Sequence, residues 1–233
     1  MKLLITDTSG PVCGVAVMDG DKVLSEMTCQ NRNTHSVSLM PMVENCLERA
    51  GQALGDMDAI GVVTGPGSFT GIRIGVATVK ALAHGSGKPC IGVDALEALA
   101  YGAGGELWQG LILPLQDARA GQVYAALFRG EDRLMPDTPM ALQDVLDRVA
   151  QLDEGPILLC GDGAEVHRAF IAEKLGERAV FAAGPFRYLR PSAAGILALR
   201  KGEATDYLHL KETYLRPPNA EKNKKLLEAM RRG

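Results

Sequence analysis

The first residues in this sequence that could perform chemistry stand at the end of its first apolar run. Ile5-Thr6-Asp7-Thr8-Ser9 is typical of a strand that ends in one acid and two hydroxyl residues. A carboxylate and hydroxyls at a strand end can hold a metal–phosphate group. The same side chains also make ordinary turns, because they hydrogen-bond to nearby backbone groups. Asp7, Thr8 and Ser9 are therefore candidate nucleotide or anion contacts, with a turn or cap as the alternative.

A glycine-rich turn is the second candidate site. Gly65-Pro66-Gly67-Ser68-Phe69-Thr70-Gly71 follows a short apolar run and leads into a helix predicted over Gly71–His84. A hydroxyl side chain of the turn can cap this helix, whose first N–H groups then face outward and can hold an anion. The lysine and adjoining Ser or Thr of a Walker loop are missing. Gly67, Ser68 and Thr70 are thus candidate anion contacts, and a tight strand–helix turn is the alternative.

Histidines and cysteines lack the spacing of a metal site. His35 stands alone before the first predicted helix, and the other histidines lie far apart at His84, His167 and His209. The cysteines are odd in number, scattered and without a C-x-x-C pair: Cys13, Cys29, Cys46, Cys90 and Cys160. This usage is typical of a reduced, intracellular protein without a zinc knuckle or a disulfide framework.

Composition limits the class of protein. The chain has 233 residues, of which 46% are hydrophobic and 5% aromatic, and its formal net charge is −3. It can bury a real core in one large or two small domains, and its small residues favour close helix–sheet packing. The slightly negative net charge argues against nucleic-acid binding driven by the overall charge of the protein.

The apolar opening, Met1 to Ile5, is too short for a signal-peptide core. No stretch reaches the roughly 18 apolar residues of a membrane span. We therefore expect a cytoplasmic protein that does not contact membranes.

The predicted elements of the first half alternate in a βββαβαβα order. Pro41 should make the first turn of the first helix irregular, or delay its start. The predicted strands are Lys2–Thr6, Gly14–Met18, Lys22–Cys29, Ala59–Val63 and Cys90–Val93, and the predicted helices are His35–Ala50, Gly71–His84 and a helix from Asp94 to the cluster at Gly102, Gly104 and Gly105. This order predicts a sheet with an antiparallel hairpin at one edge and parallel crossovers at the other.

The second half begins a new set of elements. Pro136 and Pro139 predict a loop between its second strand and its first helix. The predicted elements are strands Leu111–Leu115, Gln122–Phe128 and Ile157–Cys160, helices Leu142–Val149 and Ser192–Leu199, and a further helix after Gly161-Asp162-Gly163-Ala164.

Taken together, these segments resemble the bacterial TsaB family, also called YeaZ, over nearly the full length. The glycine-rich block is the most specific match, and its combination with a later Asp-Ala-Arg and Val-Tyr block makes coincidence implausible. The matching segments are Asp7-Thr8-Ser9, His35-Ser36, Gly65 to Gly75, Gly92-Val93 with Leu96 to Ala100, Asp117-Ala118-Arg119 with Val123-Tyr124, and Tyr214-Leu215-Arg216-Pro217 with Ala220.

The resemblance implies an α/β fold of the actin-like ATPase (ribonuclease H-like) superfold. It implies two βββαβα-type domains, of which the second is smaller and degenerate. The expected divisions are 1–100 with the dimerisation helices, 101–205 with a last helix that packs back on the first domain, and a C-terminal extension over 206–233.

The resemblance also implies a non-catalytic role. TsaB proteins are scaffold and activating subunits of the machinery that transfers a threonylcarbamoyl group to the adenosine next to the anticodon, in tRNAs that read ANN codons. The catalytic paralogue, TsaD, carries a metal-binding H-x-x-x-H on its first helix. Here that stretch is His35-Ser36-Val37-Ser38-Leu39, which lacks the second histidine. We therefore expect no catalytic residue and no metal site in this chain.

A partner interface is expected on the first two helices. Both have apolar or small residues on more than one side, and such a helix needs two burial partners. The resemblance implies that they pair with the same two helices of TsaD, or of a second copy when TsaD is missing. The expected interface residues are Leu39, Met42, Val43, Cys46, Gly71, Ile72, Arg73, Gly75, Val76, Thr78, Val79 and Leu82. Packing of these helices on their own sheet is the alternative.

The remaining expectations concern other partners and cofactors. The resemblance implies a TsaE-like ATPase as a further partner and tRNA contact through the whole complex. It implies that the chain alone binds no cofactor, with ATP or ADP at an interface of the complex. The basic tail, Glu221 to Gly233, is expected to be a solvated end, or else an arm that contacts tRNA or a partner.

Two enzyme functions remain as alternatives. An actin-fold phosphotransferase would use Asp7 and the first hairpin to bind ATP, with Gly161-Asp162-Gly163-Ala164 as its only further phosphate motif. An M22-type, glycoprotease-like metallopeptidase is disfavoured by the missing histidine.

Overall fold

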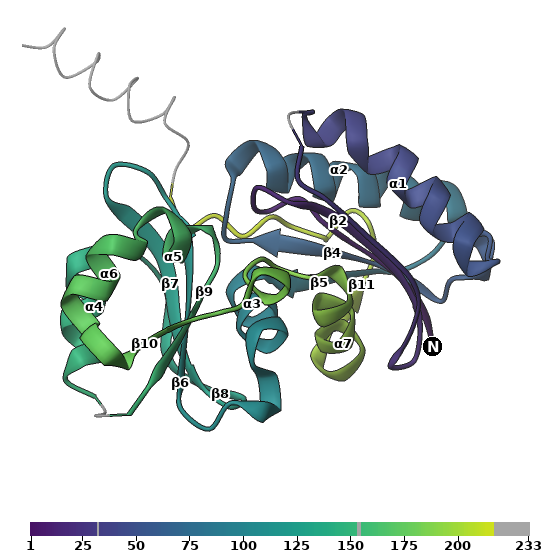
Figure 1. Cartoon of the computed structure of the whole chain (residues 1–233). Coiled ribbons are helices and arrows are strands. Elements are labelled where there is room, and N and C mark those ends of the chain that lie inside the picture. The colour runs from purple at the N-terminus through teal and green to yellow at the C-terminus, as the bar shows by residue number, and fades with distance from the viewer. Residues whose placement is uncertain (32, 153–154, 217–233) are drawn as a thin grey trace, which may run out of the picture.

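The computed structural model describes residues 1–31, 33–152 and 155–216. Two β-sheets lie side by side, each flanked by helices (Figure 1). One sheet comes from the first half of the chain and from a short C-terminal strand, and the other comes from residues 111–181. The basic tail lies outside the described residues.

The first sheet has the strand order β11-β5-β4-β1-β2-β3. β1, β4 and β5 are parallel, whereas β2 and β3 form an antiparallel hairpin at one edge, as the sequence predicts. The strands are β1 (Lys2–Asp7), β2 (Cys13–Asp19), β3 (Lys22–Cys29), β4 (Ala59–Gly65), β5 (Cys90–Asp94) and β11 (Ala204–Thr205).

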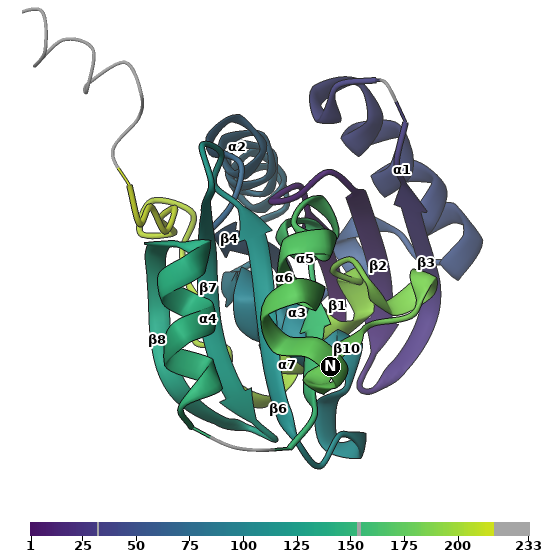
Figure 2. The same cartoon turned by 60° about the vertical axis from the view of Figure 1, so that its left-hand side comes forward.

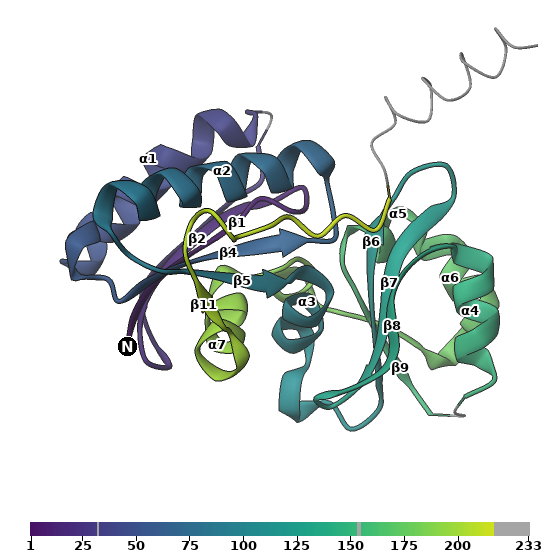
Figure 3. The ribbon, with the colours of Figure 1, turned by 180° about the vertical axis from the view of Figure 1, so that it is seen from behind.

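Helices cover both faces of this sheet. The helices α1 (His35–Ala50) and α2 (Phe69–Ser86) lie side by side on one face (Figures 1 and 3). The helices α3 (Ala95–Ala103) and α7 (Pro191–Lys201) pack on the other face, and α3 also contacts the second sheet. Its apolar side chains join one continuous core between the two sheets, which includes Leu96, Ile112 and Phe128.

The second sheet repeats the antiparallel-then-parallel pattern, with strand order β10-β9-β6-β7-β8. The helices α4, α5 and α6 cover its outer face and enclose a third apolar cluster (Figure 2). The elements are β6 (Leu111–Asp117), β7 (Gln122–Arg129), β8 (Asp132–Ala141), α4 (Leu142–Ala150), β9 (Ile157–Cys160), α5 (Asp162–Val166), α6 (Arg168–Leu175) and β10 (Ala179–Phe181), with short 3₁₀ turns at Leu54–Asp56, Gly105–Leu107, Gly176–Arg178 and Gly184–Phe186.

Two expectations about prolines are wrong. Pro136 and Pro139 lie within strand β8, where a loop was expected, because β8 is an edge strand whose pairing with β7 is irregular. A proline at an edge need not donate to a neighbouring strand. Pro41 lies inside α1, which begins at His35 without delay. Pro41 is exposed, so water can satisfy the carbonyl that its missing N–H leaves free.

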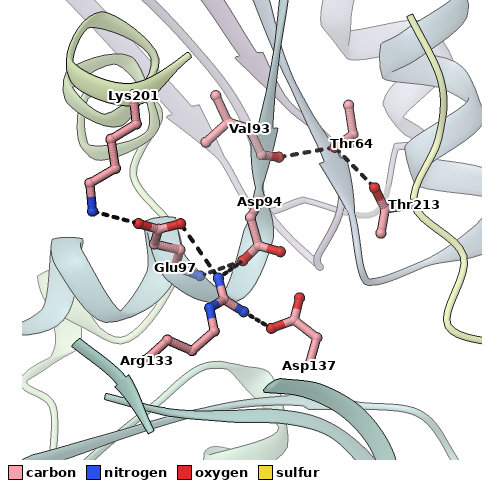
Figure 4. A network of polar contacts seen from close by, with 8 residues as sticks. All are labelled: Thr64, Val93, Asp94, Glu97, Arg133, Asp137, Lys201 and Thr213. Atoms are coloured by element: carbon pink, nitrogen blue, oxygen red, sulfur yellow. Dashed lines mark hydrogen bonds and ion pairs between the residues drawn. The ribbon is translucent and has the colours of Figure 1, made fainter. Parts of the chain in front are cut away.

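A cluster of charged side chains connects the two halves (Figure 4). Arg133 of β8 contacts Asp94 at 3.1 Å and Glu97 at 3.4 Å, both near the start of α3, and also pairs with Asp137. Lys201 at the end of α7 contacts Glu97 at 3.0 Å. Such partly exposed pairs contribute about 1 kcal/mol or less each, and those of Arg133 with Asp94 and Glu97 join β8 of the second sheet to α3.

The C-terminal segment runs from the first sheet to the second half of the molecule (Figure 3). After β11, Leu210 is buried in the core beneath α1 and α2. The Thr213 N–H donates to the Thr64 carbonyl at 2.8 Å, and the two threonine hydroxyls lie 3.4 Å apart (Figure 4). Arg216 reaches the Ala118 carbonyl of the second half at 3.5 Å. We call residues 206–216 the C-terminal strap.

Candidate functional site

The glycine-rich turn brings α2 against the loop after β1. A Cβ on Gly67 would lie 2.3 Å from the Ser9 carbonyl oxygen, and one on Gly71 would lie 2.0 Å from that of Thr8. One turn later, a Cβ on Gly75 would lie 2.5 Å from the Thr8 hydroxyl. Only glycine permits backbone approach this close. The space beside these glycines is therefore filled by Thr8 and Ser9 of the chain itself.

Asp7 and Thr8 are used in the structure of this loop. The Asp7 carboxylate accepts the Ser9 N–H at 2.8 Å, and the Thr8 hydroxyl donates to the Gly71 carbonyl at 2.7 Å. Both residues are buried. Burial raises the pKa of Asp7 to about 6, against the weaker opposing effect of its hydrogen bonds. Neither residue lines the neighbouring cavity, so the local turn interpretation fits them better than a ligand contact.

The other predicted anion contacts do face a cavity. It has a volume of about 710 Å³ and lies between the two halves of the molecule. Ser9, Gly67, Ser68 and Thr70 line its wall in the first half. The Ser68 hydroxyl caps α2 by accepting the Gly71 N–H at 3.2 Å. One of the first N–H groups of this helix is therefore already bonded within the chain.

The second half supplies further polar groups, of which only Asp162 was expected, as part of the phosphate motif of the phosphotransferase alternative. Gln116, Asp117, Arg119 and Asp162 line the opposite wall. Gln116 is 4% exposed, and its Oε1 has no hydrogen-bond partner. Burial raises the pKa of Asp162 to about 6. Arg119 adopts a left-handed backbone with φ of 65°, which is uncommon outside glycine. The cavity thus offers both acceptors and cationic donors to a polar ligand.

The C-terminal strap closes one side of the cavity. Tyr214 packs against Phe69 at the start of α2, with ring centroids 4.9 Å apart. The Arg73 guanidinium lies 4.0 Å from the Phe69 ring centroid, and its Nε donates to the Tyr214 hydroxyl at 3.0 Å. This cluster joins the exposed side of α2 to the cavity wall.

His35 has a structural contact. Its Nε2 lies 2.9 Å from the Gly10 carbonyl, which ties the start of α1 to the loop after β1. Leu39, four residues later, is buried in the core. Across the described residues, no group of three or more His, Cys, Asp and Glu side chains is arranged to hold a metal ion.

Most of the predicted interface residues pack inside the chain. They lie on the inner faces of α1 and α2, against β1, β2 and β4, because those faces complete the core of the first sheet. The buried ones are Leu39, Met42, Val43, Cys46, Gly71, Ile72, Gly75, Val76 and Val79. Because these side chains are buried within the single chain, they are not available to a partner. Arg73 is exposed, and Thr78 and Leu82 are half-buried.

The outer faces of the same two helices carry different residues. Val37 is 63% and Met40 is 37% exposed on α1. On α2, Ala77 and Ala81 are exposed, and Ile74 is half-buried. These α2 residues recur at three- and four-residue spacing, so they form one stripe of small and apolar side chains. We call the α1 and α2 residues together the outer stripe, which comprises Val37, Met40, Ile74, Ala77 and Ala81.

Some of the missed residues had a signal in the sequence. The Asp117-Ala118-Arg119 block and the Tyr214-Leu215-Arg216 block both contribute to the family resemblance, and both line the cavity. Their separation by about 100 positions hides this proximity, which only the tertiary fold creates. No signal in a single sequence marks Gln116.

In the described part of the chain, no helix has the length and apolar character needed to cross a membrane.

Comparisons with known proteins all indicate the same family. The family model described as "TsaD: tRNA N6-adenosine threonylcarbamoyltransferase" matches residues 22–185. The tRNA threonylcarbamoyladenosine biosynthesis protein TsaB of Bacillus subtilis is 36% identical, over 95% of this chain and 96% of the relative. An uncharacterised Mycobacterium tuberculosis protein is 33% identical over 94% of this chain and 93% of its own.

Solved structures give the same result for the fold. YeaZ from Pseudomonas aeruginosa superposes with a TM-score of 0.72 at 28% identity, over 92% of this chain and 99% of that chain. The ethanolamine utilization protein EutJ from Carboxydothermus hydrogenoformans, at 11% identity and a TM-score of 0.54, covers 84% of this chain and 90% of its own, and shares the fold alone. The fold is the actin-like ATPase superfold that the family resemblance implies. With sequence and structural relatives matched along almost their whole length, the chain belongs to the TsaB (YeaZ) family.

Proposed function

We propose that this chain is a non-catalytic subunit in the biosynthesis of threonylcarbamoyladenosine in tRNA. The observation that carries the proposal is the 36% identity to Bacillus subtilis TsaB over nearly the full length of both proteins. The site geometry supports the non-catalytic part. His35 is bonded to the backbone, Asp7 is buried and bonded, and the glycine-rich turn is filled by residues 8 and 9.

The catalytic partner would be a TsaD-like paralogue that docks on α1 and α2. The outer stripe supports this assignment, because small side chains such as Ala77 and Ala81 allow another helix to approach closely. Apolar side chains such as Val37 and Met40 gain from being covered. The proposed contact residues are therefore the outer stripe together with Arg73, Thr78 and Leu82, in place of the buried residues expected from sequence. The same surface would pair two copies of the chain when the partner is absent.

Reconstitution tests the function. The chain, a TsaD-like protein and a TsaE-like ATPase from the same cells would be purified separately and combined with unmodified tRNA, ATP and a threonylcarbamoyl donor. We expect modified adenosine, measured by mass spectrometry of digested tRNA, only when the chain and its TsaD-like partner are both present. Modification by the chain alone would contradict a non-catalytic role. Full activity without the chain would contradict its place in the complex.

The two enzyme alternatives receive no specific support. A phosphotransferase that depends on Asp7 needs that carboxylate in the cavity, and the structure buries it behind Ser9. Among the relatives that match along their length at 30% identity or more is the tRNA-modification protein of Bacillus subtilis. This match favours the tRNA-modification function over both enzyme alternatives. ATP turnover measured on the purified chain is the direct test of the phosphotransferase alternative.

A further inference from the structure

Two of the five cysteines face each other across the first hairpin. Cys13 is the first residue of β2 and Cys29 the last residue of β3, and they are direct partners in the antiparallel register. Opposite residues in such a pair point to the same face of the sheet, with Cα atoms about 4.5–5.5 Å apart. Disulfides span Cα separations of about 4.4–6.8 Å. The register therefore places the two Cα atoms within the range that a disulfide spans.

The surroundings of the two thiols differ in a way that suits stepwise oxidation. Cys29 is half-buried, and the Asn31 side-chain amide donates to its sulfur at 3.0 Å. Cys13 is 1% exposed, and burial, with smaller contributions from Asp7 and Cys29, raises its pKa to about 12. Cys29 is thus the thiol that an external reagent meets first, and Cys13 is the internal thiol beside it.

The other three cysteines are placed differently. Cys46 lies on α1, where its sulfur is 3.3 Å from the Ser25 hydroxyl and 3.5 Å from the Val15 carbonyl. Cys160 is fully buried in the core between the two sheets, and Cys90 is buried on β5. Neither Cys90 nor Cys160 shares a strand pair with another cysteine. Cys13 and Cys29 are therefore the pair that the sheet register brings together among these residues.

We propose that Cys13 and Cys29 form a site of reversible thiol oxidation that closes to an intramolecular disulfide in the presence of a small disulfide oxidant. This inference does not depend on the proposed function. The Cys29 thiolate attacks one sulfur of the oxidant and releases its other half as a thiolate. Cys13 then attacks the Cys29 sulfur of the mixed disulfide, its proton passes to the departing thiolate, and the second thiol leaves. The two protein thiols lose two electrons in total, and the oxidant disulfide is reduced to two thiols.

The position of the bridge gives it a structural consequence. It would join the end of β3, from which the chain enters α1, to the start of β2. Cys13 belongs to the apolar cluster beneath α1, which also contains Leu39 and Val43, and Cys29 packs against this cluster. Oxidation would therefore lock the sheet edge under one of the two helices of the outer stripe.

The test uses the full reduced chain and oxidised glutathione as the probe. Trypsin should place Cys13 in a peptide of residues 3–22 and Cys29 in a peptide of residues 23–32, so a bridge appears as these two peptides linked. We expect this linked species to dominate in the folded chain, to disappear on treatment with dithiothreitol, and to be absent from Cys13→Ala and Cys29→Ser. Cys46→Ser should leave it unchanged.

The single variants separate the two steps. In Cys13→Ala we expect a stable glutathione adduct on Cys29, because the internal thiol that would displace it is gone. In Cys29→Ser we expect at least a tenfold slower reaction with glutathione disulfide, because the accessible thiol is lost. Circular dichroism confirms that each variant is folded. A stable adduct on Cys29 in the wild-type chain without a linked peptide, or a dominant link to Cys46, would overturn the proposal.

Discussion

The inner and outer faces of α2 both use small residues, for opposite reasons. On the inner face, Gly71 and Gly75 let the helix backbone approach the Thr8 carbonyl and hydroxyl, and an added Cβ would lie 2.0–2.5 Å from those atoms. On the outer face, Ala77 and Ala81 are exposed, and α2 lies beside α1 on the outside of the first sheet (Figure 3). A small residue therefore marks a contact already made on one face and, in our proposal, a contact still to be made on the other.

A sequence motif can be specific to a family because its glycines serve the chain's own packing. The glycine-rich turn resembles a phosphate-binding loop because close backbone approach is what both require. Here the group that approaches is the chain's own loop after β1. The cavity lies beyond this contact, and it takes polar groups from the second half and from the C-terminal strap.

The largest effect is expected for Gly75→Arg on the inner face. A side chain there meets Thr8 and Val62 at once, and its charge would be buried without a partner. We expect a loss of unfolding free energy above about 4 kcal/mol, or failure to fold. The matched control is Gly85→Arg on the same helix, where a Cβ meets nothing within 4 Å. It should be stabilising by about 0.5–1 kcal/mol, because arginine is a better helix former.

Urea unfolding of both variants measures this difference. A folded Gly75→Arg with near wild-type stability would mean that the inner face is not packed as described, and it would restore Gly75 as a candidate partner contact.

The second effect is expected for Ala77→Arg on the outer stripe. The side chain is exposed in the single chain, so the unfolding free energy should change by less than about 0.5 kcal/mol. Binding to the TsaD-like partner should weaken by about tenfold or more, because a long cation would lie between packed helices. Ala172→Arg on α6, also exposed and helical, is the matched control and should bind normally. Isothermal titration calorimetry would measure both, and equal affinity in the two variants would move the interface away from α2.

The order of the helices and strands could be predicted well from the sequence. Which face of each helix packs against its own sheet could not. Apolar periodicity and glycine signals place β1 to β5 and α2 within two residues of their observed ends. The same periodicity does not say which stripe of a two-sided helix meets its own sheet, and so Val76 and Val79 were assigned to a partner. Ala77 and Ala81, the exposed positions beside them, went unnoticed because alanine is compatible with either face.

The second half shows a different limit of sequence reasoning. Pro136 and Pro139 argue against a strand only where that strand lies in the middle of a sheet. Whether β8 lies at a sheet edge is decided by the whole fold, which a local sequence pattern does not show. Arg133 of β8 and Glu97 of α3 are 36 positions apart in the chain, yet they meet between the two sheets (Figure 4). Contacts of this kind depend on topology, and local patterns do not contain it.

A third prediction concerns pH and the loop that the inner face packs against. Because burial raises the pKa of Asp7 from 3.8 to about 6, the folded state holds this proton more tightly than the unfolded state. The contribution of Asp7 to the stability of the wild type should therefore become less favourable as pH rises from about 4 to about 6, and the cost is fully present above that range. Asp7→Asn removes the cost and can still accept the Ser9 N–H.

We expect Asp7→Asn to gain on the order of 2 kcal/mol relative to wild type between pH 4 and pH 7. Urea unfolding at both pH values measures the gain. Asp21→Asn, at an exposed hairpin position, is the control and should show no comparable change. If the Asp7 variant loses stability as pH rises, the carboxylate is stabilised in the folded state, and it becomes a candidate ligand contact after all.

The smallest effect is expected at the border between the two faces, where Arg73 meets the C-terminal strap. Tyr214→Phe removes the acceptor of the Arg73 Nε–H, but it keeps the ring against Phe69 and leaves Arg73 over that ring. Tyr214 is 37% exposed, so water replaces the lost hydrogen bond, and we expect a cost of about 0.5 kcal/mol or less. Tyr214→Ala also loses the ring contact and should cost about 1 kcal/mol. Thermal unfolding of the two variants in parallel gives the comparison. Equal losses would show that the hydroxyl, and not the ring, holds the strap on α2, and Arg73 would then serve the chain's own fold before it serves a partner.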